Sequence, residues 1–186
     1  MLGKKKSSRL GLAVMVAAIV AMFAFAPGAS AGGKSNTTLK LDPGTAEALT
    51  SLGVSVAPVA PATAGPSGVA FPVTGFGGSL FPLALDIKHS GGLALSAGAT
   101  TVALTDYTIR LGKNPRLIAT VGGARVAILK LDLRKARIRF GWRSVSVGPV
   151  KASLTADAAG ALNGAFGVSA FTEGLVLGTA TVNLKR

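Results

Sequence analysis

The sequence contains no cysteine and a single histidine, His89, in 186 residues. It therefore has no disulfides or thiol nucleophiles, and no zinc site built from cysteine and histidine. Carboxylates are also scarce, with seven Asp and Glu against twenty Lys and Arg. They form no obvious acid–base pair, and neither a G-x-S-x-G elbow nor a P-loop occurs. We therefore expect a non-catalytic protein without a metal centre.

The N-terminus has the three parts of a secretory signal peptide. Lys4, Lys5, Lys6 and Arg9 precede an uncharged apolar run over residues 10–25, and Ala29-Ser30-Ala31 offers small residues for cleavage. This order is typical of an export signal, and 16 apolar residues are too few to span a bilayer, which takes about 20. We expect residues 1–31 to be removed, leaving no transmembrane segment and a secreted or cell-envelope protein.

Residues 32–186 have the length of one domain. Sixteen basic and seven acidic residues remain in this range, a net charge of +9. Such a charge favours an anionic partner, either a cell-wall polymer or an acidic surface, and no motif indicates specific nucleic-acid recognition. Residues 32–36 are expected to be a flexible lead. The Pro/Ala/Gly-rich stretch 58–68 is expected to be an extended connector, because its prolines disfavour helices and central strands.

Short alternating stretches separated by Gly, Asn or Asp turns predict an antiparallel β-sandwich or barrel. A repeat frames them: LKLDPGTAEALTSLGVSV and ASLTADAAGALNGAFGVSA both predict strand–helix–strand units. Asp42 and Thr155 are expected helix N-caps, and Gly53 and Gly167 are expected left-handed ends. Leu49 and Leu162 should be buried equivalents. The predicted strands between the repeats are 83–88, 93–96, 101–104, 107–111, 117–121 and 126–131.

The strongest local charge signal is a basic segment after residue 130. The apolar positions change parity there, which predicts a bulge or strand boundary at Arg134-Lys135. Alternation then predicts that Lys135, Arg137 and Arg139 face solvent, while Ala136, Ile138 and Phe140 face the core, with Trp142 in the core or at its rim. The segment either binds a polyanion or is a solvated strand face. The candidate polyanion-binding residues are Arg134, Lys135, Arg137, Arg139 and Arg143.

Residues 87–121, IKHSGGLALSAGATTVALTDYTIRLGKNPRLIATV, resemble the Htaa domain of haem-uptake surface proteins of actinobacteria. The mature chain is also similar to exported actinobacterial proteins of unassigned function that share its TLxLD start and LGTATV end. In the Htaa family a tyrosine near the domain start ligates haem iron, with a histidine close by. The resemblance implies haem as cofactor, with His89 matching that histidine. The one tyrosine, Tyr107, lies in a different strand and is the second candidate haem-binding residue.

Three hypotheses follow. The residues favour a non-catalytic binding or structural protein of the envelope, with a basic face for anionic partners and no cofactor. The resemblance favours an Htaa-like haem-binding protein. An envelope hydrolase is the third alternative, although no residues are nominated for it.

Overall fold

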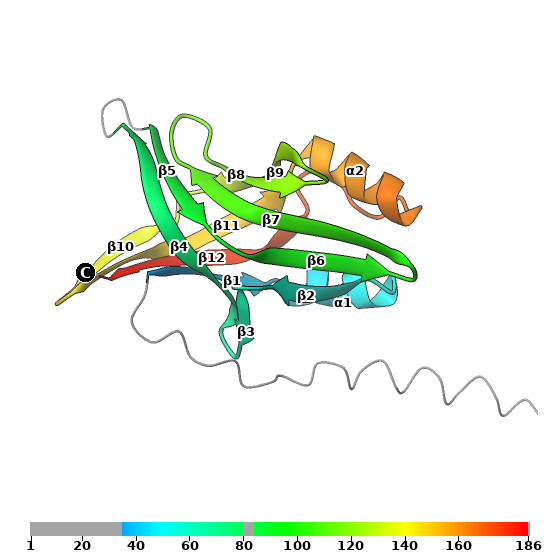
Figure 1. Cartoon of the computed structure of the whole chain (residues 1–186), viewed down its shortest axis with the longest axis horizontal. Helices are drawn as coiled ribbons and strands as arrows, with labels where there is room; N and C mark the ends of the chain where they lie inside the picture. The colour runs from blue at the N-terminus through cyan, green and yellow to red at the C-terminus, as the bar shows by residue number, and fades with distance from the viewer. Residues whose placement is uncertain (1–34, 80–83, 186) are drawn as a thin grey trace, which may run out of the picture.

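Eight antiparallel strands close into a barrel (Figure 1). The computed structural model describes residues 35–79 and 84–185, so the predicted signal peptide lies outside the described residues. The ring runs β7-β5-β4-β1-β12-β11-β9-β8, and pairing of β7 with β8 closes it. This confirms the predicted mainly β, antiparallel, barrel-like fold. The ring strands are β1 (Asn36–Leu41), β4 (Gly68–Ser79), β5 (Ala84–His89), β7 (Thr100–Arg110), β8 (Arg116–Val121), β9 (Ala124–Asp132), β11 (Ser144–Leu154) and β12 (Val176–Lys185).

Four further strands branch from this ring. A two-strand flap, β6 (Gly92–Ala97) and β2 (Ser55–Val59), extends from β7, with β2 at its edge. The short β3 (Thr63–Gly65) pairs only with β4, and β10 (Arg137–Gly141) pairs only with β11. The stretch 58–68, expected as a connector, therefore contributes to β2, β3 and the start of β4. Pro58 is accommodated because an edge strand leaves one backbone side unpaired.

Two helices follow β1 and β11, as the repeat predicts. In α1 (Pro43–Ser51) the Asp42 carboxylate accepts hydrogen bonds from the amides of Gly44 and Thr45. In α2 (Ala156–Phe166) the Thr155 hydroxyl accepts from the Ala158 amide. Gly53 and Gly167 have φ of 69° and 65°, the left-handed conformation that ends a helix. Neither helix has the length and hydrophobicity of a membrane-spanning segment.

The two repeat units return to the sheet differently. After α1 the chain enters β2 at Ser55, whereas after α2 it crosses irregular residues 168–175 before β12 begins. The predicted equivalence therefore holds for strand and helix and is wrong for the strand that follows. Leu49 and Leu162 are both buried, as predicted, and pack against the barrel interior.

The intermediate strands also match the prediction, with one difference. Stretches 101–104 and 107–111 form a single strand, β7, with a bulge between Thr105 and Thr108. Asp106 lies in the bulge with φ of 50°, a conformation that aspartate tolerates better than most residues. Arg125 of β9 donates to the Asp106 carbonyl and to the Thr108 hydroxyl, both at 2.6 Å, and so holds the bulge from across β8.

Candidate functional site

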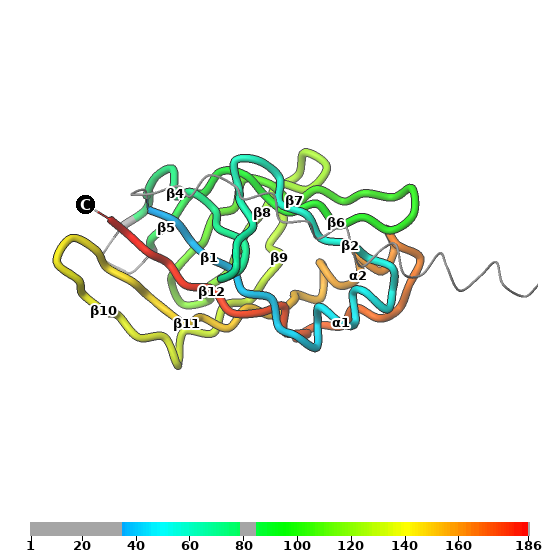
Figure 2. Tube along the Cα trace, turned by 90° about the horizontal axis from the view of Figure 1, so that it is seen from below, coloured from blue at the N-terminus to red at the C-terminus, as the bar shows by residue number. Residues whose placement is uncertain are grey.

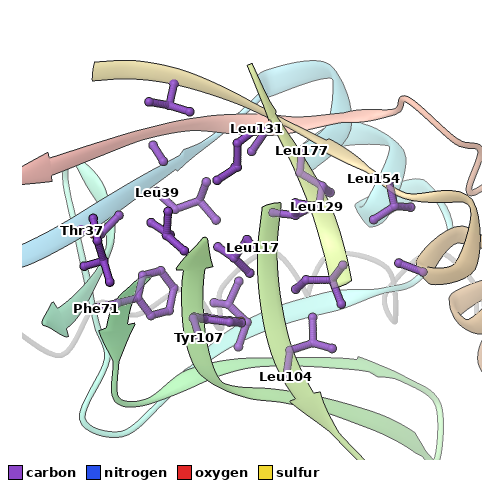
Figure 3. Close-up of a pocket in the computed structure, with 18 of the residues that line it drawn as sticks. Thr37, Leu39, Phe71, Leu104, Tyr107, Leu117, Leu129, Leu131, Leu154 and Leu177 are labelled. Carbon is purple, nitrogen blue, oxygen red and sulfur yellow. The ribbon is translucent and has the colours of Figure 1, made fainter. Parts of the chain in front are cut away.

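The barrel interior contains an apolar cavity of about 640 Å³ (Figure 3). Inward-facing side chains from all eight ring strands line it, and leucine is the most frequent of them. At one end, Leu49 of α1 and Leu162 of α2 reach the lining, so the two helices close that end. Polar groups are rare in the lining, which contains Thr37 and Tyr107 and no charged side chain.

The described residues leave the opposite end of the barrel open. Phe76 of β4 and Ile138 of β10 line the cavity, yet they are 54% and 60% exposed. Figure 2 shows the β10–β11 hairpin at the end of the molecule away from α1 and α2. The cavity is therefore a pocket with a helical floor and an apolar mouth.

His89 joins three strands beside the cavity. Its Nδ1 lies 3.2 Å from the Tyr107 carbonyl, which can only accept, so Nδ1 is the protonated nitrogen. Its Nε2 lies 2.7 Å from the Thr37 hydroxyl and accepts that proton. Both ring nitrogens are therefore engaged. The side chain is buried, and it links β5 to β1 and β7.

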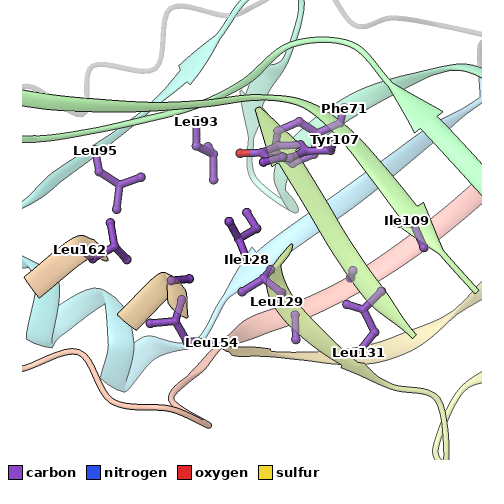
Figure 4. Close-up of a cluster of buried hydrophobic side chains, with 14 of the residues drawn as sticks. Phe71, Leu93, Leu95, Tyr107, Ile109, Ile128, Leu129, Leu131, Leu154 and Leu162 are labelled. Carbon is purple, nitrogen blue, oxygen red and sulfur yellow. The ribbon is translucent and has the colours of Figure 1, made fainter. Parts of the chain in front are cut away.

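Tyr107 places an unpartnered phenol at the cavity wall. Its ring packs edge-on against Phe71 with centroids 5.0 Å apart, and the residue is 4% exposed (Figure 4). Among the described residues its hydroxyl is the one buried side-chain polar atom without a hydrogen-bond partner. Burial raises the pKa of the phenol above its ordinary value of 10.0, so it stays protonated. The hydroxyl is covered by protein atoms, so the ring, and not the oxygen, faces the hollow.

The structure thus brings His89 and Tyr107 together, although they lie on different strands. Thr37 and Phe71 belong to the same cluster and were missed by the sequence reasoning. A signal for Thr37 existed, because it shares its strand parity with Leu39 and Leu41, and all three line the cavity. A polar residue in an inward-facing apolar series needs a buried partner, and that partner is His89.

The buried histidine should make stability depend on pH. Burial lowers the pKa of His89 below its ordinary 6.5, so the folded protein keeps it neutral where the unfolded chain takes up a proton. The stabilisation that neutral His89 gives the folded state is complete above pH 6.5. As the pH falls below that value, the free energy of unfolding decreases by at most about 1.4 kcal/mol per pH unit. Denaturant unfolding at a series of pH values from about 7.5 to 5 measures this.

The matched control is His89→Asn, which retains a donor and an acceptor but does not titrate. We expect this variant to be less stable than the parent at pH 7.5 and nearly independent of pH down to about 5. His89 is the only histidine in the chain, so no other histidine can mask the effect. A parent protein whose free energy of unfolding is flat across this range would contradict the assignment.

The basic segment lies on the projecting β10–β11 hairpin and the turn before it. A strand boundary at Arg134-Lys135 is confirmed, because β9 ends at Asp132 and β10 begins at Arg137. Arg134 forms an ion pair with Asp132, with Nη2 and Oδ2 2.7 Å apart, and lowers the pKa of that carboxyl. Lys135 lies in the turn rather than on the strand. Polyanion binding by Arg134, Lys135, Arg137, Arg139 and Arg143 stays a prediction.

The predicted inward orientation holds for Ala136, which is partly buried and lines the cavity, and is wrong for Phe140 and Trp142. Phe140 is 79% exposed and Trp142 is 99% exposed, and Ile138 is also largely exposed. Alternation does separate the apolar from the basic side chains, but β10 extends beyond the barrel and pairs only with β11. No second layer covers its apolar face among the described residues, so both faces of the hairpin meet solvent.

No protein-family model matches the sequence, and no curated protein matches it. Solved structures do match. The C-terminal domain of HtaA from Corynebacterium glutamicum superposes with a TM-score of 0.60 at 12% identity, covering 82% of this chain and 97% of that domain. The N-terminal domain of the same protein gives 0.58 at 13% identity, covering 83% and 99%.

A third match is the haem-binding protein HtaB of the same organism, with a TM-score of 0.51 at 11% identity, covering 82% of this chain and 93% of HtaB. These identities are low, so the comparison concerns the fold, and it extends over nearly the full length of each matched structure. The expected likeness to Htaa domains is thereby confirmed at the level of the fold. This chain has the fold of the HtaA and HtaB domains.

Proposed function

We propose that the protein is a non-catalytic, exported binding protein that holds an apolar small molecule of tetrapyrrole size in its barrel, with haem as the first candidate. The observation that carries this proposal is the open cavity of about 640 Å³ with its almost wholly apolar lining. The shared fold with HtaB, a haem-binding protein, supports the choice of haem. The predicted signal peptide supports an extracellular or envelope location.

The cavity has the properties of a preformed ligand site. Pockets for small molecules measure about 300–1,000 Å³, and an eight-stranded barrel is wide enough to hold one small ligand. Several lining leucines, including Leu39, Leu104 and Leu117, are only partly buried because they face this hollow rather than one another. Each Å² of apolar surface that a ligand covers contributes about 25 cal/mol, so a flat apolar ring gains most of its affinity from these side chains.

The residues that line the cavity are better suited to apolar contact with the haem ring than to ligation of its iron. His89 cannot ligate iron in this arrangement, because both of its nitrogens are hydrogen-bonded. The Tyr107 hydroxyl has no hydrogen-bond partner, and tyrosine serves as a haem ligand in other proteins, but this oxygen is covered by protein atoms and would reach an iron only after a local shift. No cation lines the described cavity, so carboxylates on a ligand would stay at the open end. Haem bound here would supply a redox-active iron, and the protein would supply an apolar enclosure.

Titration of the purified protein with haemin and with iron-free protoporphyrin tests the proposal. Because apolar contact dominates, we expect both to bind, with dissociation constants within about tenfold of each other, a difference of about 1.4 kcal/mol. Absorbance in the Soret region follows haemin, and fluorescence follows protoporphyrin. Failure of both to bind would overturn the proposal, and binding of haemin alone would show that iron ligation, not the cavity, carries the affinity.

Tyr107→Phe is the matched variant, because it removes one oxygen and keeps the ring against Phe71. We expect unchanged protoporphyrin binding and a changed visible spectrum of the haemin complex. An unaltered haemin spectrum in this variant would exclude Tyr107 as the residue that holds the iron.

A further inference from the structure

The β10–β11 hairpin has one apolar face. Phe140 pairs with Val145 and Ile138 with Val147, and directly opposed residues in an antiparallel pair point to the same side. The two-residue turn Trp142-Arg143 forms the tip. Trp142, Phe140 and Ile138 are three of the four large hydrophobic residues that are exposed in the described chain. Most of the large, exposed hydrophobic side chains of the described residues therefore lie on this hairpin.

Cations accompany this apolar face. Arg137 and Arg139 alternate with Ile138 and Phe140 and so occupy the opposite side of β10, while Lys135 precedes the strand and Arg143 lies at the tip. All four are exposed, and within residues 35–79 and 84–185 none of them forms an ion pair. The carboxylate nearest in sequence, Asp132, is already bound by Arg134.

The apolar face of the hairpin is continuous with the cavity wall. Across the next pairing, Val147 lies opposite Val182 and Val145 opposite Leu184. Ile138, Val147, Val182 and Leu184 all line the cavity. A single apolar surface thus runs from the barrel interior, through the mouth, to the tip of the hairpin.

We propose that the β10–β11 hairpin docks the protein on an anionic lipid bilayer, with Trp142 and Phe140 inserted at the headgroup level and the four cations against lipid phosphates. Aromatic side chains with flanking Lys and Arg are the combination that favours the membrane interface. Basic side chains are attracted to anionic headgroups, and this attraction decreases with salt. A soluble polyanion would use the cations and leave the exposed Trp, Phe and Ile without a role. Docking in this way places the mouth of the cavity at the lipid surface.

The protein carries its own reporter for this test, because Trp142 is its only tryptophan. The exported protein is mixed with phosphatidylcholine vesicles, with and without phosphatidylglycerol. With phosphatidylglycerol we expect flotation with the vesicles, a blue shift of the emission and protection from an aqueous quencher. If the protein floats while Trp142 stays fully quenchable, the hairpin is not inserted and the proposal is wrong. Absence of binding to either vesicle would also overturn it.

Two variants separate a membrane from a polyanion. Phe140→Ser/Trp142→Ser should weaken vesicle binding at least about tenfold and leave retention on heparin resin unchanged, because contacts with a soluble polyanion are electrostatic. Lys135→Ser/Arg137→Ser/Arg139→Ser should weaken both. The control is Lys40→Ser/Lys88→Ser/Lys151→Ser, which removes three exposed cations from the outer faces of barrel strands, away from the hairpin. All these side chains are exposed, so circular dichroism should show unchanged folding.

If Phe140→Ser/Trp142→Ser floats as well as the parent, the hairpin binds anions through its cations alone. An anionic wall polymer then becomes the partner and the membrane proposal is rejected. The same holds if the control triple loses vesicle binding as strongly as the hairpin triple, because net charge rather than the hairpin would then govern attachment. Neither result bears on whether the cavity binds a porphyrin.

Discussion

Replacing Leu104 and Leu117 together by tryptophan should abolish porphyrin binding, with a loss of affinity of at least about 100-fold, or roughly 3 kcal/mol. Both leucines line the cavity and are only partly buried, so larger side chains can enter the hollow. Two indole rings would occupy the space that a flat ligand needs. Overpacking should be limited to about 1–3 kcal/mol, because the new rings meet a void rather than a filled core.

The matched control places the same two residues on the outside of the same two strands. Ala103→Trp/Ile118→Trp changes the sequence neighbours, which point away from the cavity because side chains alternate along a strand. This control should bind haemin and protoporphyrin as the parent does. If the Leu104/Leu117 variant folds and still binds with the parent's affinity, the ligand lies outside the barrel and the proposed site is wrong.

Local chemistry in the sequence was sufficient to predict much of this fold. Asp42 followed by Pro43, and Thr155 followed by Ala156, predict helix starts because a side-chain oxygen can accept from free amides in the first turn. The structure has both bonds. Alternation over short segments predicts strands, and the break at Arg134-Lys135 follows from a change of parity. These inferences succeed because the interactions lie within a few residues of one another.

Features that depend on what lies across the barrel could not be predicted in this way. The alternation of Ile138 and Phe140 with arginines is typical of a half-buried strand, and it correctly separates two faces. It cannot show that β10 continues past the barrel, where no element of the described chain covers it. Trp142 is exposed for the same reason. Alternation along a strand likewise identifies which leucines face inward. It does not show whether leucines from opposite strands pack against one another or leave a cavity between them.

The candidate site was predicted in part. His89 and Tyr107 were both named, from a family resemblance and from their being the only residues of their kinds. His89 bonds to the backbone carbonyl of Tyr107 and not to its phenol. Together with the bond to Thr37, this leaves the histidine no free nitrogen. Residue type alone indicates what a side chain can do. The partners that occupy its atoms come from strands far away in sequence, such as the one carrying Thr37.

Alanine substitution of Leu154, Leu49 or Leu162 should each cost about 2–5 kcal/mol of stability, with Leu154→Ala the most costly. Among the described residues, Leu154 is the largest side chain that is fully buried, and it lies at the end of β11 just before α2. Leu49 and Leu162 attach α1 and α2 to the floor of the cavity. All three leucines line the hollow, so truncation removes fewer contacts than in a filled core. Leu154→Ala should be the most costly because Leu154 is the least exposed, at 2% against 4% for Leu49 and 7% for Leu162.

Thermal or denaturant unfolding measures these effects, and for a domain of this size they correspond to roughly 4–20 °C in Tm. Gly160→Ala is the control within α2. A Cβ at that exposed position meets no atom within 4 Å, so alanine should raise stability by about 0.5–1 kcal/mol through helix propensity and a restricted unfolded chain. The losses in free energy of unfolding caused by Leu49→Ala and Leu162→Ala should agree within about 1 kcal/mol if the two helices close the end of the barrel equivalently. A Leu162 variant as stable as the parent, with Leu49→Ala strongly destabilised, would show that α1 alone closes the barrel and that the equivalence of the two units ends at their sequences.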